Sequence, residues 1–365
     1  MQMFMFCFFV VLQFSVASAN TFLDYAENSL FNPENAPRIG LEVELTGLTQ
    51  QEIGEELQKA LGGALKWVTI MEDNLNSHTR KIETYPVHEL HLVNSSMVAD
   101  VIIKPEDNVT ENADMAEQKA RTRIYEIVTP PIRYEQAIPL QAALESMQLK
   151  GAQGTRDGHA VAIQVNVEMG EGDPKNISAL KILAILRNYL KPEHRESIAH
   201  ELQAPAFRQM YLGLYTPGMM SRILDNNYRP SNKQFFFDFM YRQSLELLGV
   251  REAWIMPEAK ARKALQSILA QRPFDEILPV VKWNYIRASA VLMFLYPKDW
   301  LSRYLHDTTW FHQYPILEFR EANSDFLLLK RIKQFLGIVQ YSETHGDIVW
   351  SEGMSQLQCR QLFAK

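Results

Sequence analysis

The sequence predicts an α+β fold with an antiparallel sheet and a large helical insertion. Strand patterns cluster in the first half of the chain, helical patterns follow, and one strand pattern returns late. Hydrophobic residues make up 47% of the 365 residues and charged residues 22%, which is ordinary globular composition and argues against a disordered or fibrous chain. Two cysteines exclude a disulfide scaffold and a cysteine-based zinc cluster. A net charge of −6 without a long Lys/Arg run argues against nucleic acid and favours small molecules or metal ions as partners.

The first 19 residues have the pattern of a secretory signal peptide. Phe4–Phe14 is an uncharged apolar run, and Ala17-Ser18-Ala19 follows it as a cleavage-site pattern. The run is too short for a membrane-spanning helix. The alternatives are a mis-assigned start and an apolar tail that contacts a membrane surface if it is not cleaved. We therefore expect a leader, residues 1–19, and a single domain, residues 20–365.

Alternation of apolar and polar residues with period two identifies the strands. The pattern is clearest in Ala160–Met169 (AVAIQVNVEM), and Pro130-Pro131 ends the strand before it. The expected strands are Arg38–Thr46, Lys66–Met71, Val87–Val93, Arg123–Thr129, Ala160–Met169 and Ile316–Glu321.

Helical spacing of apolar residues identifies the helices between and after these strands. Thr49 is a plausible N-cap of the first helix, and Gly62-Gly63 stops it. The segment Lys104–Gln118 is acidic and polar, so we expect an exposed loop there. The expected helices are Gln50–Leu61, Tyr134–Lys150, Asn176–Tyr189, Phe235–Leu248, Ala259–Gln271, Trp283–Leu295 and Phe326–Val339. The domain thus divides into a strand-rich part (38–170), a helical insertion (175–300), a returning strand (316–321) and C-terminal helices (326–365).

Four of the expected strands carry polar side chains on one face and aliphatic side chains on the other. In the segment GLEVEL, Glu42 and Glu44 lie on one face, with Cα atoms roughly 6.5–7 Å apart. A sheet with one face in water explains any single strand of this kind. Because four strands show the same division into a polar and an aliphatic face, we favour one polar surface that they share. The other strands contribute Glu126, Gln164, Asn166, Glu168, Glu318 and Arg320.

If these side chains converge, the carboxylates need cations or protons between them. Two carboxylates about 5 Å apart repel each other by roughly 3 kcal/mol at an effective dielectric constant near 20. Carboxylate and amide oxygens suit Mg²⁺ or Mn²⁺ better than zinc. Such ions commonly keep substrate phosphates as ligands, and Arg320 could balance a γ-phosphate. The residues therefore indicate phosphoryl transfer from a nucleotide.

The same residues carry a family resemblance. The succession GLEVEL, YEIVTPP, AIQVNVEM and LEFREANS resembles the carboxylate–amine ligase superfamily, which includes glutamine synthetase and glutamate–cysteine ligase. More narrowly it is similar to the amidoligases. The resemblance covers about residues 38–325 and implies a curved antiparallel sheet of the glutamine synthetase type, with helices on one face.

The resemblance also implies roles for individual residues. Gln164 and Asn166 stand where many relatives have His-x-His. At these two positions this chain has amide groups in place of imidazole ligands. Arg320 matches an arginine that contacts nucleotide phosphate, and Lys282, Asn284 and Arg287 lie on a helix with substrate or phosphate roles. A solvated basic face is an equal explanation of that helix. The implied metal ligands are Glu42, Glu44, Glu126, Glu318 and Gln164.

The implied activity is formation of an amide or peptide bond with ATP and Mg²⁺ (or Mn²⁺). A carboxylate, from an amino acid or a peptide, becomes an acyl phosphate that an amine captures. Two alternatives remain open: an exported binding protein that keeps the scaffold without turnover, and a hydrolase that uses a carboxylate pair. The leader favours export, whereas ATP favours the cytoplasm.

Overall fold

The computed structural model describes eight stretches of the chain, and the statements below refer to them. They are residues 31–75, 82–106, 120–155, 161–168, 179–190, 217–225, 227–271 and 316–345. The expected leader and the expected helix Trp283–Leu295 lie outside the described residues. Within these stretches, no helix combines the length and the hydrophobicity needed to span a membrane.

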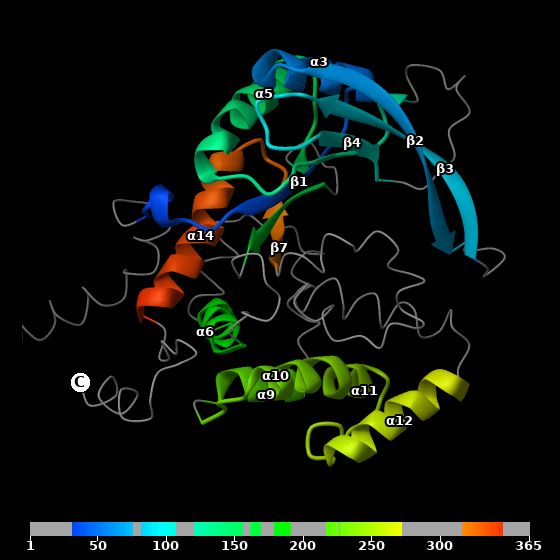
Figure 1. Cartoon of the computed structure of the whole chain (residues 1–365), viewed down its shortest axis with the longest axis vertical. Coiled ribbons are helices and arrows are strands. Elements are labelled where there is room, and N and C mark those ends of the chain that lie inside the picture. Colours follow the sequence, from blue (N-terminus) through cyan, green and yellow to red (C-terminus); the bar gives the residue numbers. More distant parts are fainter. Residues whose placement is uncertain are drawn as a thin grey trace, which may run out of the picture.

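A seven-stranded sheet, antiparallel at every pairing, forms one end of the molecule (Figure 1). The strand order β2-β3-β4-β5-β1-β6-β7 places β1 between β5 and β6. This sheet, together with the helices, confirms the α+β class. The strands are β1 (Ile39–Leu45), β2 (Ala64–Leu75), β3 (Ile82–Val93), β4 (Val101–Pro105), β5 (Tyr125–Val128), β6 (Ala162–Glu168) and β7 (Ile316–Asn323).

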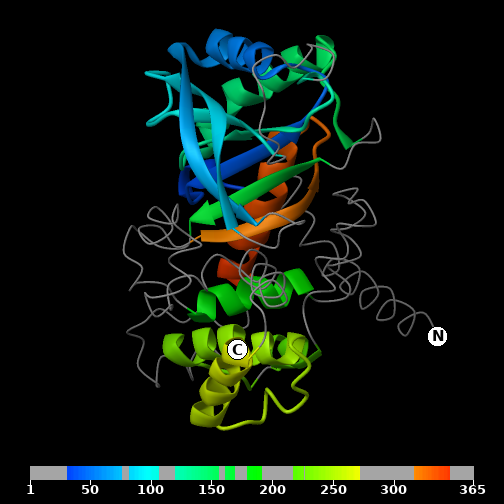
Figure 2. The same cartoon turned by 90° about the vertical axis from the view of Figure 1, so that its right-hand side faces the viewer.

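One face of the sheet is apolar and forms the core. Five residues that pair across neighbouring strands are all nearly inaccessible to solvent. Three helices pack together on this face: α3 (Gln50–Leu61), α5 (Ala137–Leu149) and α14 (Leu328–His345) (Figures 1 and 2). Each fully buried aliphatic side chain contributes about 1.5–3 kcal/mol. The paired residues are Leu90, Ile103, Ile127, Val43 and Ile163.

The bounds of α3 agree with the sequence prediction because both ends carry local signals. The Thr49 hydroxyl accepts a hydrogen bond from the Glu52 N–H, and the Glu52 carboxylate accepts one from the Thr49 N–H. At the other end, Gly62 has φ of +73°, a conformation that favours glycine. The helix therefore begins and ends where the sequence indicates.

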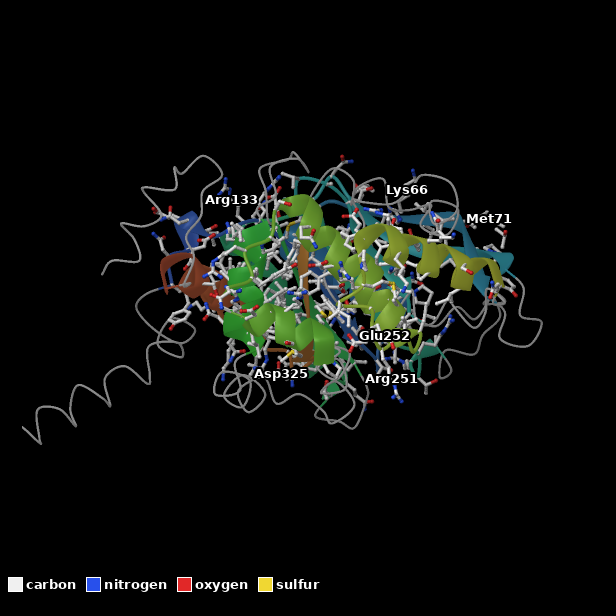
Figure 3. The ribbon with its side chains drawn as sticks, turned by 90° about the horizontal axis from the view of Figure 1, so that it is seen from below. Lys66, Met71, Arg133, Arg251, Glu252 and Asp325 are labelled. Atoms are coloured by element: carbon white, nitrogen blue, oxygen red, sulfur yellow. The ribbon has the colours of Figure 1, made fainter. Side chains whose placement is uncertain are left out.

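The insertion is helical in the parts that the structure describes. Its helices are α6 (Ala179–Leu190), α9 (Pro217–Leu224), α10 (Asn232–Phe237), α11 (Gln243–Leu247) and α12 (Glu258–Gln271). A π-helical turn, η5 (Asp238–Arg242), joins α10 to α11. Figure 3 views these helices from below, with Arg251 and Glu252 in the turn between α11 and α12. Helix α6 contacts α14, and Tyr189 packs edge-on against Phe319 of β7.

Two sequence expectations about strands need correction. The sequence pattern predicts an exposed loop over Lys104–Gln118, but Lys104 and Pro105 belong to β4, a strand that this pattern does not predict. Strands β2 and β3 extend beyond the expected Lys66–Met71 and Val87–Val93, and pair over their whole length. In both cases, backbone pairing to a neighbouring strand stabilises residues whose side chains lack an apolar pattern.

Candidate active site

The sheet face opposite the apolar row carries the polar side chains that the sequence indicates. Cross-strand partners share a face, so the pairing register shows which side chains meet. Glu44 of β1 lies opposite Glu126 of β5, which in turn lies opposite Lys104 of β4. Glu42 lies opposite Gln164 on the other side of β1. The expected shared polar surface is therefore present.

Three carboxylates form a cluster on this face. Oxygen atoms of Glu44, Glu106 and Glu126 all lie within 4.8 Å of one another. Glu44 and Glu126 are buried, whereas Glu106 is exposed. The Lys104 Nζ lies 3.0 Å from the Glu126 Oε2 and offsets part of the negative charge. At this separation each carboxylate pair repels by roughly 3 kcal/mol, which makes the cluster a candidate cation site.

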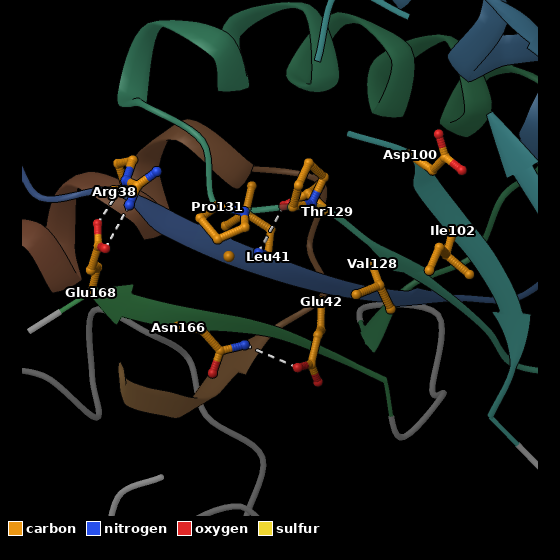
Figure 4. A pocket seen from close by; sticks show the side chains of 12 residues that line it. Arg38, Leu41, Glu42, Asp100, Ile102, Val128, Thr129, Pro131, Asn166 and Glu168 are labelled. Carbon is orange, nitrogen blue, oxygen red and sulfur yellow. Dashed lines mark hydrogen bonds and ion pairs between the residues drawn. The ribbon is translucent and has the colours of Figure 1, made fainter. Parts of the chain in front are cut away.

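Amide groups of β6 fix the carboxylates of β1. Gln164 Nε2 donates to Glu44 Oε1 over 3.0 Å, and the Ala162 N–H donates to Glu44 Oε2 over 2.7 Å. Asn166 Nδ2 donates to Glu42 Oε1 over 2.9 Å (Figure 4). Gln164 is 1% exposed, and its Oε1 has no hydrogen-bond partner within the described stretches. An orphaned buried acceptor thus lies beside the carboxylate cluster.

The returning strand brings Glu318 to the same face but not into the cluster. Glu318 is half-buried and pairs with Asn166 of β6, which in turn pairs with Gly40 of β1. Glu318 therefore lies two strands away from β1, level with a residue four positions before Glu44. Strand spacing and rise put the Glu44 and Glu318 Cα atoms roughly 16 Å apart. One ion cannot bind both carboxylates at that distance.

The basic residues of the sequence prediction are only partly described. The backbone of Arg320 lies in β7, at the irregularity in its pairing with β6 near Gln164. The Arg320 side chain, and the whole of Lys282, Asn284 and Arg287, lie outside the described residues. Their roles stay predictions.

Glu106 is not among the predicted site residues, because the sequence predicts a loop over the segment that contains it. Ile102, Lys104 and Glu106 alternate with period two, which would have placed Glu106 on the polar face of an extended segment. The Glu106 N–H donates to the Ile124 carbonyl over 3.0 Å and holds the residue beside the entry to β5.

A pocket of about 260 Å³ lies on the same face beside the cluster (Figure 4). At one edge, Arg38 donates two hydrogen bonds of 2.7 Å to Glu168. At its back, the Leu41 N–H donates to the Thr129 hydroxyl over 2.9 Å. The lining residues are Arg38, Gly40, Leu41, Glu42, Asp100, Ile102, Val128, Thr129, Pro130, Pro131, Asn166 and Glu168.

Comparison with known families identifies the kind of protein that carries this site. Residues 35–253, more than half of the chain, match the family described as "Putative amidoligase enzyme". The chain belongs to the amidoligase family. The family name indicates an enzyme of the ligase class. The match includes the carboxylate cluster and ends before β7, so Glu318 and Arg320 lie outside it. Comparisons with curated proteins and with solved structures gave no match.

Proposed function

We propose that this amidoligase is an ATP- and Mg²⁺-dependent carboxylate–amine ligase, related to glutamine synthetase and glutamate–cysteine ligase. Its substrates are a carboxylate, from an amino acid or peptide, and an amine. The sheet is the counterpart of the catalytic sheet of that superfamily.

The carboxylate cluster is the observation that carries the proposal. Glu44, Glu106 and Glu126 supply only oxygen donors, and the orphaned Gln164 Oε1 adds an amide oxygen beside them. This donor set fits Mg²⁺ or Mn²⁺ and lacks the nitrogen and sulfur ligands that zinc prefers. When bound, Mg²⁺ supplies charge neutralisation at the phosphates of ATP.

The residues of the sheet hold the cluster in one geometry. Two hydrogen bonds, from Gln164 and the Ala162 N–H, fix both oxygens of Glu44. Because these groups belong to paired strands, the carboxylates need little reorganisation when a cation binds. Glu42 and Glu318 extend the acidic surface along the sheet, and we assign Arg320, Lys282, Asn284 and Arg287 to phosphate and substrate contacts.

The reaction needs no covalent bond to the protein. An oxygen of the substrate carboxylate bonds to the γ-phosphorus of ATP, and the bond between that phosphorus and the β,γ-bridging oxygen breaks, which releases ADP. A substrate that arrives as an ammonium ion first gives up one proton. The free amine nitrogen then bonds to the acyl carbon, and phosphate leaves with the C–O electron pair and takes up the extra proton of the nitrogen. Positioning and charge stabilisation suffice for both steps.

Calorimetry with the full chain tests the cation site. We expect Mg²⁺ to be required for binding of an ATP analogue with a β,γ-imido bridge, and Glu44→Gln or Glu126→Gln to weaken that binding more than tenfold. Glu135→Gln is the matched control, because it removes one exposed carboxylate of the turn Tyr134–Gln136 that belongs neither to the cluster nor to the pocket lining. Nucleotide binding that needs no Mg²⁺, or that survives both substitutions unchanged, would contradict the proposal.

Turnover is tested by phosphate release from ATP in the presence of amino acids and peptides. We expect release that depends on both a carboxylate and an amine substrate, and that Glu44→Gln abolishes. Nucleotide binding without release under any pair of substrates would instead favour a binding protein on the same scaffold.

A further inference from the structure

The pocket beside the carboxylate cluster has an apolar floor. Ile102, Val128 and Glu42 follow one another across β4, β5 and β1, so the floor is about 10 Å wide from Ile102 to Glu42. Pro130 and Pro131 add apolar surface at the edge. At about 260 Å³, the pocket suits a small molecule with a short aliphatic body.

The charged groups of the pocket are mostly acidic. Of its four charged side chains, Arg38 and Glu168 pair with each other in a bidentate salt bridge. The remaining two are the carboxylates of Glu42 and Asp100, which lie at opposite sides of the floor (Figure 4). Carboxylates bind ammonium groups through charge-assisted hydrogen bonds, so this lining favours an ammonium group over a phosphate group.

Both carboxylates are held in place by neighbouring side chains. Asn166 Nδ2 donates to Glu42 over 2.9 Å. The Asp100 Oδ2 lies 3.6 Å from His91 Nδ1, and His91 Nε2 lies 2.8 Å from the Glu89 carboxylate behind it. The Asp100 side chain is 47% exposed and lines the pocket.

We propose that this pocket binds the amine substrate, as a primary ammonium group attached to an aliphatic body. The inference rests on the proposed ligase function, which requires an amine. Glu42 lies two residues from Glu44 on the same strand face, with Cα atoms roughly 6.5–7 Å apart, so an ammonium group bound by Glu42 is a neighbour of the carboxylate cluster. The acyl group that the amine must reach is formed beside that cluster.

Saturation-transfer NMR with the full chain tests the pocket in the absence of nucleotide. The probes are n-pentylamine, n-pentanol and pentanoate, which share a chain length and differ in charge. We expect pentylamine to bind at least tenfold more tightly than pentanol, and pentanoate not to bind. Asp100→Asn and Glu42→Gln should each weaken pentylamine about tenfold, and Glu135→Gln should leave it unchanged.

Three results would overturn the inference: equal binding of pentanol and pentylamine, pentylamine binding that both substitutions leave unchanged, and displacement of pentylamine by adenosine. Calorimetry of Mg²⁺ and the imido nucleotide on the same preparation separates this inference from the ligase proposal. If nucleotide binds and pentylamine does not, only the pocket assignment fails. If pentylamine binds as expected and nucleotide does not, the amine site stands and the ligase function fails.

Discussion

At the scale of single residues, Glu56 shows how a buried charge joins two helices. Its side chain is 3% exposed and lies between α3 and α5. Burial alone would raise the pKa of the Glu56 carboxyl. Hydrogen bonds from Lys150, Lys59 and Ser146 outweigh this effect and lower the pKa from 4.5 to about 2. The ionised form of the Glu56 side chain is therefore more stable in the folded protein than in the unfolded chain.

Substituting Glu56 should reduce stability in a pH-dependent way. Because the folded pKa is depressed, the stabilisation is complete above about pH 5 and is lost as the pH falls towards 2. We expect Glu56→Gln to lower the free energy of unfolding by about 2 kcal/mol at pH 7. This value is smaller than the pKa shift alone gives, because solvent screens the ion pairs with the exposed lysines. Urea unfolding at pH 7 and pH 3 measures this, with the exposed Glu55→Gln on the same helix as control. A loss that is equal for both variants would refute the assignment.

Lys104 gives a second prediction at this scale. Its ammonium group lies 3.0 Å from Glu126 and competes with any cation for that carboxylate. We expect Lys104→Gln to tighten Mg²⁺ binding without nucleotide about fivefold, as measured by calorimetry. Weaker Mg²⁺ binding in this variant would show that Lys104 supports the cluster in another way.

At the scale of elements, the cap of α3 can be tested separately from the core. Thr49→Ala removes the hydroxyl that accepts from the Glu52 N–H, and we expect a loss of about 1 kcal/mol in the free energy of unfolding. Thr49→Ser keeps the hydroxyl and should retain most of the stability. Thermal unfolding of the three proteins decides between them, and equal losses in both variants would assign the effect to the Thr49 methyl group instead.

The elements also show what could be predicted from sequence. Helix α3 and strands β1 and β6 have complete local signals, in the form of caps or period-two alternation, and were predicted correctly. Strand β4 has only five residues and lies next to an acidic run, so its sequence pattern is weak. Its pairing with β3 and β5 identifies it as a strand. Pairing between distant segments leaves no local signal. Glu106 alternates with Lys104, but this alternation is informative only once the segment is known to be extended.

At the scale of the whole molecule, the shared face of Glu42, Glu44, Glu126 and Glu318 was predictable from alternation alone. The distances within it were not, because strand order and register decide which carboxylates meet. The order β4-β5-β1 brings Glu126 to Glu44, whereas β7 lies beyond β6 and carries Glu318 away from them. Metal binding by these residues stays a prediction.

Cation binding should stabilise the whole fold, since the cluster joins β1, β5 and the end of β4. Saturating Mg²⁺ with the imido nucleotide at about 100 times its dissociation constant adds about 2.7 kcal/mol. We expect a rise of several degrees in the unfolding temperature, reversed by a chelator and absent in Glu44→Gln. A rise of equal size in Glu44→Gln would place the stabilising cation elsewhere.

The position of β7 also bears on how the protein is made. Strand β6 ends at residue 168 and its edge partner β7 begins at residue 316. At ordinary translation speeds, a ribosome needs roughly 7–30 s to synthesise the intervening chain. During that interval the nascent polypeptide presents the outer edge of β6, beside the groups that orient Glu44, to any extended segment nearby. Because β7 is the last strand along the chain in the described sheet, its pairing with β6 is the step that completes the sheet.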